Sequence, residues 1–355
     1  GGDPKTKVAK RDQLFTAVAP FDAPRPFEST EHRFAGIAFL PDGDRVLITD
    51  VDRDRRWSRT VVRSRKNPAA EAKVIFDRSL TDLRTRVKTD IETPTKHFYM
   101  VGETYTGDRN LMKYYVDPLT KLDGQFDFAH RAEICSKILL RKGTMQELET
   151  FLNGNDSFYG NGIMSTFIGN HDLPRVIHLA QDNAFTPEWE NPWYDGKDRN
   201  WSNQPGLPGS QSAFERMANA FTLLMTTRGV PLIYYGDEIG LPGAGDPDNR
   251  RDMQWSGYSA GQNLLKTHLQ KLGQIRKDHV ALRRGNRTSL WATTNSMAYK
   301  MVHPMETVYV VINRGDGQDS VSGLPNGTLT NQLTGQTVTG PTINIPARTS
   351  MILTQ

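Results

Sequence analysis

The 355-residue chain is 37% hydrophobic and 24% charged, with 30 Gly and 20 Pro. This composition is typical of a soluble globular protein of about two or three domains, and it excludes extended disorder. The sequence contains no apolar run of about 18 residues, so it predicts no transmembrane helix. Residues 1–4 carry neither an initiator Met nor an apolar signal core, and we expect a processed or truncated start.

The charged side chains are unevenly distributed. Lys and Arg number 44 against 40 Asp and Glu, which gives a net charge of +4. Residues 1–79 hold 16 basic and 12 acidic side chains, and the remaining residues hold 28 of each. Because the basic residues alternate with Asp, we expect no nucleic-acid footprint. The single cysteine, Cys135, excludes an internal disulfide and a cysteine-cluster metal site, and it is predicted to be buried and unreactive.

Residues 1–79 are predicted to form short antiparallel strands. The turn Pro41-Asp42-Gly43-Asp44 would join two of them into a hairpin. A meander of this size leaves one face bare and needs neighbours for independent stability. The predicted strands cover 13–19, 34–40, 45–50, 57–64 and 73–76.

From about residue 80 the pattern changes to compact apolar strands that alternate with helical stretches, as in a parallel sheet or barrel. Helices are predicted over 83–92, 211–227 and 261–276; in the last two, apolar residues recur at three- and four-residue intervals. The predicted parallel strands are 97–102, 122–127, 164–169 and 230–235.

From about residue 296 the pattern returns to strands separated by Gly and Asn turns, which suggests a small β-sandwich. Its predicted strands are 298–302, 308–312, 320–323, 342–345 and 350–353. The expected fold class is therefore α/β. We expect a β-propeller-blade-like antiparallel meander over 1–79, an incomplete (β/α)8 barrel with later strands only over 80–286, and a C-terminal β-sandwich over 287–355. A closed barrel needs eight strands from about 250 residues, whereas 80–286 offers about four.

Polar residues follow three of the predicted parallel strands. Glu103 follows the first, Asn170-His171-Asp172 the third and Gly236-Asp237-Glu238 the fourth. The C-terminal ends of barrel strands meet at one rim, so these side chains are predicted to converge. Paired carboxylates there suit glycoside hydrolysis, in which one donates a proton and another stabilises the oxocarbenium-like centre. The alternative is that each acidic residue caps the next helix, although three such endings in order favour catalysis.

The motifs around these residues resemble a known family. Val101-Gly102-Glu103, the segment FIGNHD at 167–172 and the segment GVPLIYYGDEIG at 229–240 resemble the later motifs of the α-amylase superfamily of glycoside hydrolases. The segment DPDNRR at 246–251 does so too, and the resemblance covers roughly residues 80–355.

The resemblance implies a role for each matching residue. Glu103 matches the general acid/base, which must hold its proton near neutrality on a partly desolvated rim. Asp172 matches the carboxylate that stabilises the transition state, and His171 matches a histidine that hydrogen-bonds the sugar; the alternative for His171 is a structural role. Asp246 and Arg250 match a pair that lines the sugar pocket in cyclomaltodextrinase-like members, with a solvated ion pair as the alternative.

The resemblance also implies a substrate and surroundings. The expected partner is an α-glucan or maltooligosaccharide, with no nucleic acid and no membrane. No cofactor is expected with certainty; Ca²⁺ is compatible with the family, and so is an extracellular or periplasmic location. Five aromatic residues could stack on glucose rings, although bare aromatics more often serve packing: Tyr105, Trp193, Trp201, Tyr235 and Trp255.

One essential family element is missing. The retaining mechanism uses a nucleophilic carboxylate in a G-x-R-x-D pattern about 25–35 residues before the acid, and the sequence lacks it there. Asp77 has about the right spacing, but Ile75 stands where the pattern requires Arg. Segments 30–38, 52–60 and 73–79 instead resemble the propeller domain of prolyl-oligopeptidase-family peptidases. We therefore predict that two unrelated coding fragments meet near residues 79–80 and that this chain alone is inactive or nearly so.

Two other functions stay open at this point. The chain could be a non-catalytic α-glucan-binding protein that uses His171, Asp172, Asp246 and Arg250. It could also be an interaction module built on the N-terminal meander. Binding of maltooligosaccharides without turnover would favour the first, and a stable 1–79 fragment with a partner would favour the second.

Overall fold

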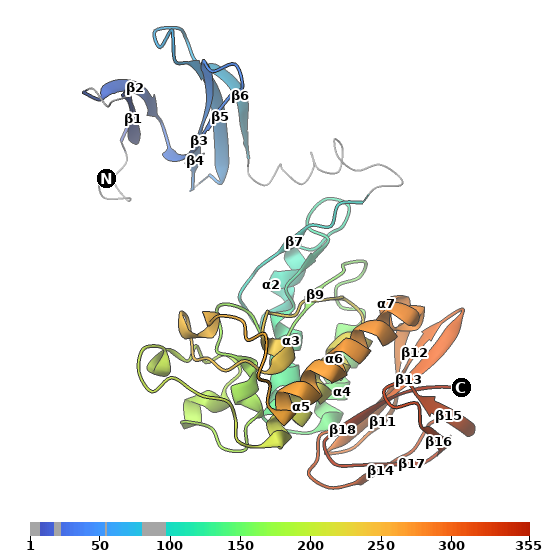
Figure 1. Ribbon diagram of the computed structural model, residues 1–355. Coiled ribbons are helices and arrows are strands. Elements are labelled where there is room, and N and C mark those ends of the chain that lie inside the picture. The colour runs from blue at the N-terminus through green and yellow to red at the C-terminus, as the bar shows by residue number, and fades with distance from the viewer. Residues whose placement is uncertain (1–7, 18–22, 54, 80–96) are drawn as a thin grey trace. The chain divides into compact units, whose positions relative to one another are not determined.

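A computed structural model of the chain describes residues 8–17, 23–53, 55–79 and 97–355 (Figure 1). The chain divides into two compact units, residues 1–98 and 99–355, which are described separately below. The helix expected over 83–92 lies outside the described residues.

The first unit contains only antiparallel strands within its described residues. A hairpin pairs β1 with β2, and a four-stranded sheet has the order β3-β4-β5-β6. The predicted meander is therefore confirmed, but β2 was not predicted, and the strand expected over 13–19 ends at Thr16. The strands are β1 Asp12–Thr16, β2 Arg25–Thr30, β3 Arg33–Phe39, β4 Arg45–Asp52, β5 Trp57–Ser64 and β6 Lys73–Ser79.

The second unit contains four short parallel strands, which alternate with its helices and loops. They are β7 Val101–Gly102, β8 Gly124–Gln125, β9 Ser165–Thr166 and β10 Val230–Pro231. Parallel pairing joins β7 to β8 and β9 to β10, and a bridge between Phe126 and Ser165 joins the two pairs. All four predicted strands are present in the expected order but are much shorter than predicted. The ladders β7–β8 and β9–β10 each pair only two residues of each strand.

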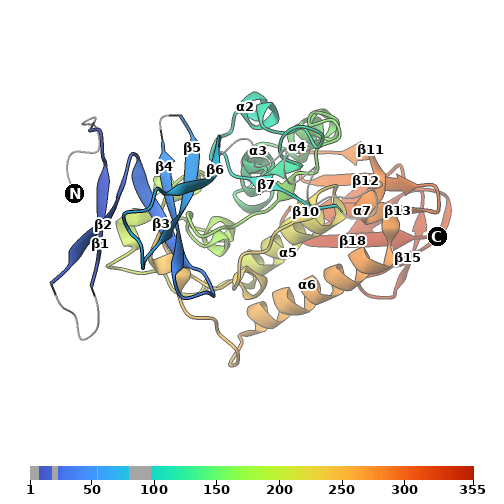
Figure 2. The same cartoon turned by 90° about the horizontal axis from the view of Figure 1, so that it is seen from above.

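The helices of the second unit begin at recognisable caps. Ser210 precedes α5, and Thr144 and Ser259 form capping boxes with Glu147 and Gln262 at the starts of α4 and α6. The two helices predicted over 211–227 and 261–276 are confirmed as α5 and α6, which lie side by side (Figure 2). The helices are α2 Arg109–Tyr114, α3 Phe128–Ile134, α4 Met145–Asn155, α5 Gln211–Thr226, α6 Ala260–Asp278 and α7 Val280–Arg284.

The C-terminal part is built from two antiparallel sheets. One has the order β11-β12-β13-β18-β15-β16, and the other pairs β14 with β17. All five predicted strands are present, whereas β11, β15 and β16 were not predicted. The strands are β11 Asn286–Ala292, β12 Ser296–His303, β13 Glu306–Asn313, β14 Asp319–Val321, β15 Gly327–Asn331, β16 Thr337–Gly340, β17 Ile343–Ile345 and β18 Thr349–Thr354.

The largest apolar cluster of the second unit joins its helices to the C-terminal sheet. It packs α3, α4, α5 and α6 against the inner face of the six-stranded sheet, with Phe221, Leu265 and Val310 among its fully buried members. Cys135 is buried in the same core, as predicted, and burial raises the pKa of its thiol. The helices and the C-terminal sheet therefore share one interior, because apolar side chains from both exclude water together.

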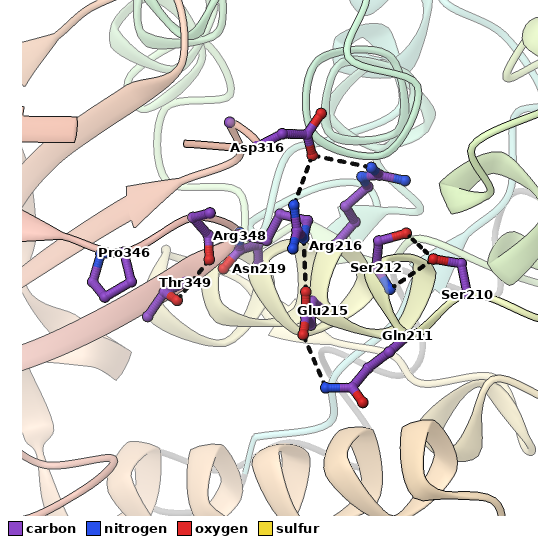
Figure 3. A network of polar contacts seen from close by, with 12 residues as sticks. Ser210, Gln211, Ser212, Glu215, Arg216, Asn219, Asp316, Pro346, Arg348 and Thr349 are labelled. Atoms are coloured by element: carbon purple, nitrogen blue, oxygen red, sulfur yellow. Dashed lines mark hydrogen bonds and ion pairs between the residues drawn. The ribbon is translucent and has the colours of Figure 1, made fainter. Parts of the chain in front are cut away.

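A polar network reinforces this junction (Figure 3). Arg216 of α5 lies 2.7 Å from Asp182 and 3.3 Å from Asp316, which follows β13. Asp316 is also 2.9 Å from Arg348, which in turn lies 2.7 Å from Glu215 of α5. Helix α5 is thus tied to two loops of the C-terminal sheets by charge-assisted hydrogen bonds.

Candidate active site

The loops that follow the parallel strands carry the predicted site residues. Glu103 directly follows β7, and its side chain is exposed. Among the described residues it makes no hydrogen bond or ion pair with the other candidates. The partly desolvated environment expected for the acid is therefore not provided by this part of the chain.

The other four predicted residues lie together. The guanidinium of Arg250 donates from Nε to Asp246 Oδ1 at 2.6 Å, and its Nη2 lies 4.0 Å from Asp172 Oδ1. His171 Nε2 lies 3.4 Å from the same Asp172 oxygen. All four side chains are about half exposed, so they form one polar surface that is open to solvent. The hydrogen bond from Arg250 to Asp246 raises the pKa of the guanidinium, which stays charged.

Local hydrogen bonds explain why the loop after β9 presents His171 and Asp172. Asn170 Oδ1 accepts from the Asp172 amide at 3.1 Å, which closes a tight turn. The buried Asn249 donates from Nδ2 to the carbonyls of His171 and Leu173, each at 2.8 Å. This long-range clamp brings Arg250, the next residue, beside Asp172. The sequence motif contained Asn249, but nothing in its spacing indicated the clamp.

A buried histidine, His178, forms a hydrogen bond between the same two loops, below the exposed surface. The Gly243 amide donates to His178 Nε2 at 3.1 Å, and the Arg175 amide donates to the Gly243 carbonyl at 3.0 Å. His178 is therefore held in its neutral form, and burial lowers its pKa to about 3. Neither His178 nor Arg175 was predicted, since these contacts join residues some 60 positions apart.

The predicted aromatic residues differ in their surroundings. Trp201 and Trp255 are 78% and 80% exposed, so their faces are accessible to a ligand. Trp193 instead stacks on Phe128 at 6.2 Å and meets the ring of Tyr105 edge-on at 5.8 Å. Trp193 therefore serves packing, as expected for a bare aromatic, and burial raises the pKa of the Tyr105 hydroxyl.

The described residues offer no metal centre. Within 8–17, 23–53, 55–79 and 97–355, no three His, Cys, Asp or Glu side chains gather in a way that could hold a metal ion. These side chains therefore give no support for the Ca²⁺ that the resemblance allowed. In the same part of the chain, no helix combines the length and apolarity needed to cross a membrane.

Parts of the chain are similar in sequence or in fold to known proteins. A family model described as "Alpha amylase, catalytic domain" matches residues 59–191. A cyclomaltodextrin glucanotransferase of Paenibacillus macerans is 29% identical over 215 residues, which cover 59% of this chain and 25% of the relative. A maltogenic alpha-amylase of Bacillus acidopullulyticus is 36% identical over 151 residues, which cover 41% of this chain and 20% of the relative.

These matches support the predicted resemblance of this chain to the α-amylase superfamily. A crystal structure of the α-amylase from Geobacillus thermoleovorans, complexed with acarbose, shares the fold with a TM-score of 0.61. At 23% identity this likeness covers 78% of the present chain and 57% of that structure. The chain spans about a quarter of the length of the curated glucanotransferase, so the α-amylase-like region is one part of what such relatives contain. The family match begins at Arg59, within β5 of the first unit.

Proposed function

We propose that the α-amylase-like region is the glycan-binding part of a glycoside hydrolase that cleaves α-1,4-glucosidic bonds with retention. The observation that carries the proposal is the surface of His171, Asp172, Asp246 and Arg250, which come from two loops beside neighbouring parallel strands. Carboxylates and a guanidinium at this spacing suit the paired hydroxyls of a sugar ring. Two solved structures of similar fold contain bound acarbose and maltose, and these ligands favour an α-glucan or maltooligosaccharide as the substrate.

Each residue has a distinct role in this proposal. Glu103 would protonate the glycosidic oxygen as the bond to the anomeric carbon breaks, and later remove a proton from the attacking water. The carboxylate of Asp172 would stabilise the positive charge that develops on the ring. His171 would donate a hydrogen bond to a sugar hydroxyl, while Asp246 and Arg250 would hold the same ring from the other loop.

We propose further that this chain alone does not complete the reaction. The retaining mechanism needs a second carboxylate about 5 Å from the acid, and the sequence lacks the G-x-R-x-D pattern that would supply it. Asp77, the alternative with suitable spacing, is exposed on β6 and accepts a hydrogen bond from Trp57 Nε1. Losing a covalent nucleophile costs about 10⁶-fold in turnover.

Reducing-sugar release from maltoheptaose tests this proposal. The full chain and Glu103→Gln are both expected to release no sugar above the uncatalysed rate. Cleavage by the full chain that is lost in Glu103→Gln would identify Glu103 as the acid and show that a nucleophile is present. Asp77→Asn would then be the first variant to test.

A second candidate function is α-glucan binding without catalysis, and the exposed four-residue surface favours it. Titration calorimetry with maltoheptaose would show millimolar or tighter binding by the full chain. Asp172→Asn should weaken that binding, whereas Asp278→Asn, an exposed carboxylate at the end of α6, should leave it unchanged. Equal affinities of both variants would contradict the proposed surface.

We also propose that residues 1–79 come from a propeller-like coding fragment joined to the α-amylase-like region. The basis is the change in sequence pattern near residue 80; the boundary between the two units lies later, between residues 98 and 99, and the family match begins earlier, at Arg59. Resequencing the source DNA across codons 75–85 tests the join. A continuous reading frame in independent samples would support a genuine fusion, and a different sequence upstream of codon 80 would refute it.

A further inference from the structure

A buried ion pair lies in the same two loops as the exposed four-residue surface. Arg175, from the loop after β9, donates from Nη1 to Asp237 Oδ1 at 3.2 Å. Asp237 belongs to the loop after β10, and each of the two residues is only 1% exposed. Removing two charges from water is costly, so such a pair is weak evidence for stability alone and calls for another reason.

The remaining contacts of Arg175 are with a pair of tyrosines. Its Nη1 also donates to the Tyr235 carbonyl, and its guanidinium carbon lies 4.2 Å from the ring centroid of Tyr234 and 4.6 Å from that of Tyr235. Its Nε and Nη2 have no hydrogen-bond acceptor within the described part of the chain. The flat cation thus lies against both aromatic rings, which meet each other edge-on, an arrangement that the compact ammonium of lysine does not reproduce.

Two glycines, Gly169 and Gly236, make room for the ion pair because they lack side chains. A Cβ on Gly169 would lie 2.1 Å from Asp237 Oδ2, so only glycine fits there. Gly236 has a φ of +85°, and a Cβ on it would come within 2.8 Å of Leu241 and 3.3 Å of Arg175 Nη1. The backbone of both loops is therefore shaped around Arg175 and Asp237.

We propose that Arg175 is a positioning residue for glycan binding: it holds Tyr234 and Tyr235 in place beside His171 and Asp172. The ring of Tyr234 lies 6.4 Å from that of His171. Tyr235 is 40% exposed, and its hydroxyl donates to the Arg251 carbonyl at 2.9 Å, next to Arg250. Through the two tyrosines Arg175 sets the spacing between the His171–Asp172 loop and the Arg250 loop. This inference rests on the proposed glycan-binding function.

The charge of Asp237 gives this role a pH dependence. Burial raises the pKa of Asp237 to about 6, and the neighbouring Arg175 opposes that rise. The groups that face Asp237 are Arg175, Glu238, Arg131 and the thiol of Cys135. Below about pH 6 Asp237 takes up a proton, and Arg175 loses the counter-charge that fixes it.

Maltoheptaose titrations of the full chain between pH 5 and pH 8 test the proposal. At pH 7.5 Arg175→Lys is expected to bind about ten-fold more weakly, because small displacements of binding groups are costly. The affinity of the unchanged protein should fall as the pH drops through about 6, and Asp237→Asn should remove that dependence. Arg276→Lys is the matched control, since Arg276 is also buried but donates to carbonyls at the end of α5 and at Leu282. Equal affinities of Arg175→Lys and Arg276→Lys would overturn the proposal.

Amide hydrogen exchange without ligand separates this inference from the proposed function. The amides of Asp237, Ile239 and Leu241 are bonded within the Tyr234–Leu241 loop, at 3.0, 3.2 and 2.8 Å. Their exchange should speed up at least ten-fold in Arg175→Lys and stay unchanged in Arg276→Lys. If the unchanged protein binds no maltoheptaose, the proposed function fails while this measurement still tests Arg175. Unchanged exchange rates in Arg175→Lys would refute the positioning role. If Arg175→Lys does not fold, the same measurement on Asp237→Asn decides.

Discussion

The two units differ in how they are held together. Within its described residues, the first unit buries two apolar side chains, Val46 and Ile48, while Phe39 is 65% exposed and Phe15 is 55% exposed. The second unit has a continuous core that joins helices to sheet. Hairpin pairing of neighbouring strands shapes the first unit around these few buried side chains, whereas the second unit excludes water from a large core. A regular ladder of strands is therefore not evidence of a stable domain.

The largest expected difference between the two units is the loss of stability when a large apolar side chain is truncated. Phe221→Ala in α5 removes a fully buried ring, so the free energy of unfolding of the second unit should fall by about 3–5 kcal/mol. Phe39→Ala in β3 should change stability by less than about 0.5 kcal/mol, because that ring is already solvated. Urea unfolding followed by tryptophan fluorescence measures both, with Trp57 reporting on the first unit. Similar losses in the two variants would contradict the comparison.

A smaller effect is expected for the polar network of α5. Arg216→Ala removes a 1% exposed guanidinium that contacts Asp182 and Asp316, so stability should fall by about 1–3 kcal/mol. In the first unit, Arg59 forms a 3.0 Å ion pair with Glu31 in which the side chains are 32% and 48% exposed, and Arg59→Ala should cost less than about 1 kcal/mol. Thermal unfolding in low and high salt distinguishes them. A loss in Arg59→Ala as large as that in Arg216→Ala would show that the first unit depends equally on its charges.

The smallest expected effect is the pH dependence of stability that His178 gives to the second unit. The pKa of His178 is about 3 in the folded protein, because burial disfavours its charge, against about 6.5 when unfolded. The unfolded chain therefore binds the proton first, and stability is lost as the pH falls below 6.5. Between pH 7 and pH 5.5 the loss should be about 1 kcal/mol. His178→Gln should abolish this part of the pH dependence, while His303→Gln serves as the control; identical pH profiles for the unchanged protein and His178→Gln would refute the assignment.

Local sequence patterns predicted the helices and strands unevenly. The apolar spacing over 211–227 predicted α5 to within a residue, because a long amphipathic helix repeats its signal over several turns. The strand β2 was missed because its sequence, RPFEST, contains a proline and one apolar side chain. The parallel strands were predicted too long, since apolar runs do not reveal where a neighbouring strand ends the ladder.

The sequence by itself determined the order of strands and loops and the identity of the polar residues that follow them. Only the tertiary structure decided which of those residues meet. His171, Asp172, Asp246 and Arg250 gather because Asn249 clamps one loop to the other, whereas Glu103 stands exposed after β7. The contacts of Asn249 with His171 and of Arg250 with Asp172 each join positions 78 residues apart. A local pattern has no means of encoding them, because their geometry depends on the packing of the whole second unit.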